Sequence, residues 1–504
     1  MAKTSSTVPD ESDALAGPSR SLKKNALGAP SIAFYIIAAA SPLTGVVGLV
    51  PVMIAIGNGA GTPATFLIAG GILLLFAVGY LAMSRHVVNA GALYSYITLG
   101  LGRVVGLGSA SLTIFAYSCI QFSLYGGFGY YLNGLLKNVT GVDIPWWLLS
   151  LIAVVICLGV GLQGVHAGGI ILGFMITLEC LMLVLLGGGI LVSPNTAAAG
   201  GISFEPFTFP ALFAAGIGVS LMFAQTTFIG FEGSAIYSEE ARNPKRSVPR
   251  ATYFALIFMA VIYAGVSFLV INALGVADAQ ATALEQSGNL IFFVSEQALG
   301  VWASQAFQVL IVTAIFAAAV TFHNNLTRYL FAMGRQGLVW SKLANTRRVQ
   351  KTPYVAGIVQ SISAAVVILG FAIAGLDPYS TLFVWLAGAG TIAIIGAQAT
   401  AAIAIFVFFR RNNVDKRLWH TVIAPILAIA GLLLLLTLAL TSLDLLIGTV
   451  PGVTPTLIAL IVLFIAVGVG YALWVRAKSP EKWEAMRVLL TSRDTDADAT
   501  AKSE

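Results

Sequence analysis

Two carboxylates lie inside apolar stretches that are long enough to cross a membrane. Glu232 stands between Gly230 and Gly233 in FIGFEGSA, and Glu179 stands in GGIILGFMITLECLMLVLL. A charge at the centre of a bilayer costs at least about 2.5–3.5 kcal/mol on insertion scales, and ionisable residues there are usually functional. We therefore predict that both carboxyl groups take part in coupling or gating. The structural alternative is that each one only bonds to neighbouring helices or backbone donors.

Glu179 has two possible functions in this setting. It lies halfway along the predicted span 168–191 and therefore near the bilayer midplane. It either loads a proton for coupling, or receives the second amine of a diamine-like substrate. A neutral carboxyl group bonded between helices is the structural alternative, and the three readings predict different phenotypes for Glu179→Gln.

The first and sixth predicted spans, 31–56 and 210–237, are interrupted. The first contains SPLTGVVGLVP, with two prolines and two glycines, and the sixth contains FIGFEGSA. Proline removes a backbone donor, and glycine permits unwinding. Irregular backbone at membrane depth is tolerated only where it is buried in protein or lines a cavity. Paired interruptions in two halves of a chain indicate a transporter binding site; two ordinary kinks in packed helices are the alternative.

Such breaks make the backbone itself a ligand. A helix that ends at the midplane offers carbonyl groups, and one that begins there offers N–H groups. We predict that N–H groups around Thr44–Gly48 hold an anionic group and that carbonyls around Phe228–Phe231 hold a cationic one, which suits a zwitterion. The predicted substrate-binding residues are Ser41, Thr44, Gly45, Val46, Gly48, Tyr117, Phe228, Gly230, Phe231 and Gly233.

Membrane helices must position these residues. The chain has 504 residues, of which 58% are hydrophobic and 10% charged, whereas soluble domains carry about 25% charged residues. Apolar runs of the length that spans a bilayer recur along the chain. The sequence therefore predicts an all-α polytopic membrane protein with twelve transmembrane helices, at 31–56, 63–84, 104–132, 146–163, 168–191, 210–237, 251–274, 302–332, 354–374, 380–409, 421–442 and 452–475.

The two interrupted spans each open a unit of five helices. Five spans in 28–191 and five in 192–410 run in opposite overall directions, which predicts a 5+5 inverted repeat. Residues 411–477 add two C-terminal helices. Residues 1–27 and 478–504 are polar and are predicted to be disordered cytoplasmic tails.

Basic residues concentrate in alternate loops. One set of loops holds Arg242 to Arg250, Arg335 to Lys351 and Arg410 to Arg417, while the other is acidic and contains only one base, Lys137. Basic loops face the cytoplasm. We therefore predict a multi-pass protein of the cytoplasmic (inner or plasma) membrane, in contact with lipids and with both termini inside. The basic residues form no nucleic-acid reading surface, so no nucleic-acid partner is predicted.

Enzymatic and metal motifs are missing from the sequence. Cys119, Cys157 and Cys180 lie within predicted spans, and no Cys/His spacing resembles a metal site. No nucleophile, metal-hydrolase or G-x-x-x-x-G-K-[ST] motif is found. We predict no enzyme activity, no cofactor, no bound metal and no ATP-driven pump.

Three motifs carry a resemblance to a known family. They are GFEGSAIYSEEARNPKRSVPRA, NAGALYSYITLGLG and NNLTRYLFAMGRQGLVWSKL. Their order and spacing over about 30–475 resemble the amino acid–polyamine–organocation (APC) superfamily. The resemblance implies a leucine-transporter-type fold and uptake or exchange of amino acids or related amines by alternating access. Phe228 resembles the aromatic lid of that fold, and Glu232 matches the sixth-helix carboxylate.

The predicted function is a permease that moves amino acids or related amines, with protons or another coupling ion as partner, by symport or exchange. Many relatives have a G-S-G-like run where this chain has Thr44-Gly45-Val46, so a polyamine or organic amine importer is an alternative. An amine-sensing receptor or channel on the same scaffold is the alternative from another class.

Overall fold

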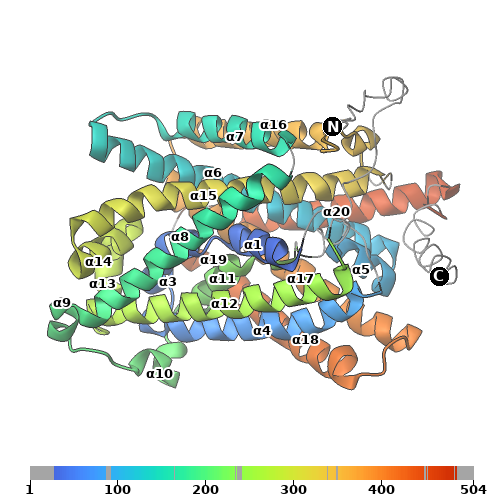
Figure 1. Ribbon diagram of the computed structural model, residues 1–504. Coiled ribbons are helices and arrows are strands. Elements are labelled where there is room, and N and C mark those ends of the chain that lie inside the picture. Colours follow the sequence, from blue (N-terminus) through green and yellow to red (C-terminus); the bar gives the residue numbers. More distant parts are fainter. Residues whose placement is uncertain are drawn as a thin grey trace, which may run out of the picture.

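The computed structural model of the chain is an assembly of helices that run side by side (Figure 1). It describes residues 28–86, 92–163, 165–232, 234, 241–335, 337, 339–347, 350–447, 450, 452–481 and 483–484. No β-strand occurs in these ranges. The all-helical prediction is therefore confirmed for the described part of the chain.

Eleven helical segments among the described residues are long and apolar enough to cross a membrane, which makes this a multi-pass membrane protein. Their helices are α1 Ala29–Ala40 continued by α2 Pro42–Thr44, the π-helix η2 Gly45–Leu49 and α3 Val50–Ile56; α4 Thr62–Ser84; α6 Arg103–Thr140; α7 Trp146–Gln163; α8 Val165–Val192; α12 Pro244–Leu274; α15 Val301–Arg335; α16 Tyr354–Ile373; η8 Pro378–Phe383 with α17 Val384–Asn412; η9 Trp419–Ile423 with α18 Ala424–Thr441; and α20 Val453–Lys478.

Shorter helices connect these spans. They are η3 Gly59–Gly61, α5 Ala92–Leu101, α9 Pro194–Ala198, η4 Glu205–Phe207, α10 Phe209–Leu212, α11 Ile217–Phe228, α13 Ala279–Gln286, η6 Ser287–Asn289, α14 Leu290–Leu299, η7 Ser341–Ala344 and α19 Leu443–Ile447.

The predicted sixth span, 210–237, accounts for the difference between twelve expected spans and eleven observed. Its regular part is α11, which has 12 residues and ends at Phe228. The backbone leaves the α-helical region at Ile229, and Gly230 has a φ of 110°. An α-helix of this length covers only about 18 Å, which is too short to cross a bilayer alone.

The other interrupted helix lies at the centre of the bundle. The most apolar window of the segment 29–56 is 100% buried inside the protein, against 17% for α20. Helices α8, α12 and α15 all pack against α1, which lies in the middle of Figure 1. Because protein covers the break on every side, its irregular backbone avoids contact with lipid.

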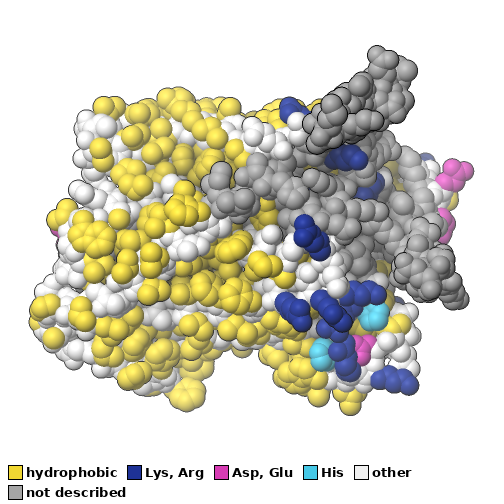
Figure 2. Space-filling view, viewed as in Figure 1, with side chains coloured by type: hydrophobic (Ala, Val, Ile, Leu, Met, Phe, Trp, Pro, Cys, Tyr) yellow, Lys and Arg dark blue, Asp and Glu magenta, His cyan; other side chains and the backbone are white. Residues whose placement is uncertain are grey.

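The outer surface divides into an apolar belt and a basic end. Large apolar side chains of α8, α12, α16, α18 and α20 are exposed, as expected of helices that face lipid. On the face shown in Figure 2, the Lys and Arg side chains gather at one end of the molecule. The asymmetry seen in the loop sequences is therefore also an asymmetry in space.

Candidate substrate site between two broken helices

The first break occurs at Ser41. This residue has a left-handed backbone (φ 44°) and precedes Pro42, which has no N–H to continue the helix. The Ser41 hydroxyl lies 2.6 Å from the Thr44 hydroxyl and donates to the Ala314 carbonyl at 3.3 Å. The outgoing half of the helix therefore begins earlier than the predicted stretch Thr44–Gly48.

That predicted stretch is helical in the structure. Residues Gly45–Leu49 form a π-helix, and the Val50 N–H donates to the Gly45 carbonyl five residues back. The Gly45 N–H donates to the Ser41 carbonyl at 3.0 Å. Widened π-turns are common at functional sites, but they leave fewer free N–H groups than an unwound strand does.

The second break places Glu232 in a closed network. Position 230 requires glycine, because its φ of 110° would be strained for a residue with a side chain. The Glu232 carboxylate is fully buried and accepts hydrogen bonds from the Tyr117 hydroxyl at 2.9 Å and from the Gly230 N–H at 3.2 Å. The Tyr80 hydroxyl donates to the Glu232 carbonyl at 2.7 Å. Glu232 thus ties the broken segment to α6, and α4 holds the same residue through its backbone.

Tyr263 of α12 joins the two breaks. Its hydroxyl lies 3.1 Å from the carbonyl oxygen of Ala40, in the last turn of α1, and 3.2 Å from that of Thr227, in the last turn of α11. Its ring stacks on Phe66 at 5.2 Å and meets the edge of Phe228 at 5.8 Å. The single hydroxyl proton is thus shared between two carbonyls at helix ends, where acceptors are otherwise left unpaired. Nothing in the sequence around Tyr263 indicates this role.

A small cavity of about 30 Å³ lies between the breaks. It has room for a water molecule but not for an amino acid. Its wall combines hydroxyl groups with apolar side chains. The lining residues are Ala40, Ser41, Thr44, Gly45, Leu49, Ile120, Ser123, Leu124, Thr226, Thr227, Phe322, Phe383 and Ala387.

Three predicted substrate residues, Ser41, Thr44 and Gly45, line this cavity. Thr226 and Thr227 were missed, although two hydroxyl residues at the end of an apolar helix are a detectable signal. Ser123 and Phe383 were also missed and come from α6 and η8, which the sequence does not connect with the breaks.

The other predicted residues lie near the cavity without lining it. The Phe228 ring faces α12 and α4, where it meets Tyr263. The Phe231 ring meets the edge of Phe76, and Val46 is buried. The remaining predicted residues contact neighbouring groups instead. Gly48 lies beside Phe383. The Tyr117 hydroxyl and the Gly230 N–H both donate to the Glu232 carboxylate. Gly233 lies outside the described residues.

Glu179 reaches the first break from α8. Its side chain is 1% exposed, and its carboxylate lies near the Leu43 N–H. The other oxygen, Oε2, has no partner among the described residues. Leu43 is in the first turn of the outgoing half-helix, where backbone N–H groups have no partner within the helix. An acidic group placed there interacts favourably with the positive end of the helix dipole. The carboxyl group therefore faces a backbone donor of the first break, and one of its oxygens is unpaired within the described ranges.

Removing the Tyr263 hydroxyl tests the link between the breaks. We expect Tyr263→Phe to keep the ring packing, to lower stability by about 1 kcal/mol and to weaken substrate binding about fivefold, because two buried carbonyls lose their donor. Thermal unfolding and equilibrium substrate binding measure the two effects. Tyr354→Phe is the control, since the Tyr354 hydroxyl bonds to no described residue; equal effects in both variants would contradict the link.

Among the described residues, no three His, Cys, Asp or Glu side chains gather where they could hold a metal ion. A family model described as "Amino acid permease" matches residues 27–470. The chain belongs to this family. The match spans both breaks and the helices around them.

Individual relatives are distant. The chain is 25% identical to the branched-chain amino acid permease BcaP of Bacillus subtilis over 60% of its length, and the match covers 66% of that protein, just under two thirds. It is 26% identical to the methylthioribose transporter of Bacillus subtilis, with 77% of this chain and 82% of that protein covered. It is 24% identical to the serine/threonine exchanger SteT of the same organism, with 72% of this chain and 79% of that protein covered. These relatives are transporters, and the family assignment agrees with transport rather than enzyme activity.

Proposed function

We propose that this permease is a secondary active transporter that moves amino acids or related amines across the cytoplasmic membrane by alternating access. One observation carries the proposal: two broken helices face each other across a hydroxyl-lined cavity, and Tyr263 bonds to the last turn of both. Backbone groups and small hydroxyls at such breaks suit the charged ends of a zwitterion.

The cavity wall favours a neutral amino acid with an apolar side chain. Ile120, Leu124 and Phe322 supply apolar surface, and no ionisable side chain of the described chain lines the cavity. A second ammonium group would have no carboxylate there. The name of the branched-chain permease relative agrees with such a substrate. The open oxygen of Glu179 supports the alternative, an importer of polyamines or other organic amines.

Coupling to protons is assigned to Glu179, and gating to Glu232. Glu179 has an available oxygen at the start of the outgoing half-helix, so a proton there changes the group that holds the break. Glu232 bonds to both its own segment and Tyr117 of α6, so its release would free the sixth helix. Exchange without net proton movement is the other mode that this arrangement permits.

We also propose the complete architecture expected from the sequence. In it, α11 is one half of a broken sixth span, which brings the number of spans to twelve. The repeats occupy 28–191 and 192–410, and 411–477 adds two helices. Residues 1–27 and 478–504 are cytoplasmic tails. Two observations support this arrangement: the first helix is buried at the centre of the bundle, and α11 is short. In this arrangement each repeat begins with its broken helix.

Proteoliposome uptake tests the function. Purified protein is reconstituted and offered a panel of radiolabelled amino acids and polyamines, with and without a pH gradient. We expect uptake of a neutral amino acid above protein-free vesicles. Uptake of a polyamine alone would favour the amine importer, and saturable binding without uptake of any compound would favour a receptor.

Orientation is tested by single cysteines in a chain whose Cys119, Cys157 and Cys180 have been replaced. Glu285→Cys in α13 and Lys245→Cys in α12 are both exposed positions. We expect a membrane-impermeant maleimide added to intact cells to label the cysteine at 285 and not the one at 245, because basic loops stay inside. The reverse labelling pattern would place the termini outside.

A further inference from the structure

A second and larger cavity lies away from the two breaks. Its volume is about 460 Å³, within the range of small-molecule sites. Its walls come from the C-terminal end of α6, the start of α7, α14, α15 and the start of η8. Asp143 and Asp377 at its rim are exposed, so the cavity opens to the surface of the protein. It shares no lining residue with the central cavity.

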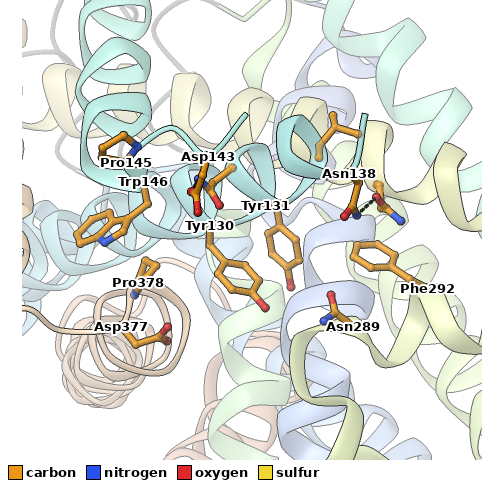
Figure 3. Close-up of a pocket in the computed structure, with 14 residues that line it drawn as sticks. Tyr130, Tyr131, Asn138, Asp143, Pro145, Trp146, Asn289, Phe292, Asp377 and Pro378 are labelled. Carbon is orange, nitrogen blue, oxygen red and sulfur yellow. Dashed lines mark hydrogen bonds between the residues drawn. The ribbon is translucent and has the colours of Figure 1, made fainter. Parts of the chain in front are cut away.

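The walls of this vestibule carry negative charge and aromatic rings. Figure 3 shows Tyr130 and Tyr131 side by side, with Asp143 and Asp377 on the Tyr130 side and Phe292 on the other. Aromatic faces and carboxylates are the groups that attract organic ammonium ions. No Lys or Arg of the described chain lines the cavity.

The two carboxylates differ in how far they are already paired. Hydrogen bonds from Asn133 and Lys137 lower the pKa of Asp143 below its ordinary value, so this carboxylate stays ionised. In Asp377, Oδ1 caps η8 by accepting from the backbone N–H groups of Tyr379 and Ser380. Its Oδ2 has no hydrogen-bond partner in the described ranges. Two carboxylates against one ammonium, Lys137, leave the rim with a net negative charge.

A thin aromatic wall separates the vestibule from the central cavity. Tyr131 donates its hydroxyl to the Val47 carbonyl at 3.4 Å, and Tyr379 donates to the Gly48 carbonyl at 2.9 Å. The Tyr379 ring lies 5.0 Å from Tyr130 on the vestibule side and stacks at 5.7 Å on Phe383, which lines the central cavity. A ligand held against Tyr130 is therefore separated from the π-helix of the first break by one side-chain layer, Tyr379.

We propose that this vestibule is a separate binding site for a free organic ammonium compound, held by Asp143, Asp377 and the partly exposed ring of Tyr130. Its role as the first stop on the route to the central cavity rests on the proposed transport function. Binding of the ammonium group itself does not depend on transport. Weak affinity is expected, because both carboxylates are exposed and water competes for them.

Saturation-transfer NMR of cadaverine on the purified full chain in a phospholipid-free, uncharged detergent tests the site. The neutral diol 1,5-pentanediol is the comparison ligand of the same length. We expect cadaverine to bind with a dissociation constant on the order of millimolar, with weaker binding in high salt. The same affinity should persist in Gly45→Val, provided that this variant elutes as a monodisperse protein, because a Cβ on Gly45 meets Tyr263 and Thr227, neither of which lines the vestibule.

Two substitutions locate the site. Asp377→Asn removes the charge and keeps the oxygen that caps η8. Asp143→Asn keeps an acceptor for Asn133 but removes both the charge and the ion pair with Lys137. We expect each to weaken cadaverine binding about two- to fivefold, whereas Glu205→Gln, an exposed outer-loop control, leaves it unchanged. Binding that is unchanged in both Asp variants, binding no stronger than that of pentanediol, or binding lost in a monodisperse Gly45→Val protein would each overturn the proposal. Failure of substrate uptake with these binding results intact would overturn only the transport function.

Discussion

Gly45→Val is expected to reduce substrate binding and uptake by about ten- to a hundredfold while the protein still inserts and folds. A Cβ atom on Gly45 would lie 2.6 Å from Tyr263 Cε1 and 3.0 Å from Thr227 Cγ2. Such contacts force the two broken helices apart, and overpacking typically costs about 1–3 kcal/mol. The displaced groups include Tyr263, which bonds to both helix ends, so the geometry of the cavity is lost before the fold is.

The control is Gly71→Val on α4. A Cβ there meets nothing within 4 Å, so the same change of residue tests insertion and helix propensity without touching the cavity. Equilibrium binding, proteoliposome uptake and size-exclusion profiles are compared for both variants. Uptake at the wild-type level in a monodisperse Gly45→Val protein would show that the substrate binds elsewhere.

Glu179→Gln is expected to abolish accumulation driven by a pH gradient while exchange continues. Glutamine retains an oxygen for the Leu43 N–H but cannot gain or lose a proton at neutral pH. With one proton per substrate, a gradient of one pH unit supports about tenfold accumulation, and this should fall to no accumulation in the variant. Uptake with and without the gradient, and exchange of preloaded substrate, are measured on the same vesicles.

The other readings of Glu179 give different results. A role in binding a second amine predicts a changed substrate preference instead of lost coupling. A purely structural role predicts wild-type uptake, pH dependence and selectivity in Glu179→Gln, and a loss of stability only in Glu179→Ala, which leaves the Leu43 N–H unpaired. Glu296→Gln is the control, because it removes an exposed carboxylate that does not line the central cavity. Wild-type coupling in Glu179→Gln would end the proton-carrier assignment.

The sequence alone determined the features that depend on local physical chemistry. Apolar runs of membrane-spanning length predicted an all-helical membrane protein, and the structure confirms this through eleven candidate spans. Pro42 and Gly230 marked the two breaks correctly, because a missing N–H and a positive φ are properties of single residues. The family motifs were confirmed by the match over 27–470.

Only the tertiary structure decided which side chains meet at those breaks. Tyr263 bonds to Ala40 across 223 positions of sequence, and Glu179 of α8 reaches Leu43. Phe228 turns toward α12 and α4, while Phe383 of η8 closes the cavity. Hydropathy cannot predict these contacts, because every face of a central helix is buried and the rotation of each helix is set by packing against its neighbours. The outer vestibule arises for the same reason, since its walls come from segments that are neighbours only after the bundle has formed.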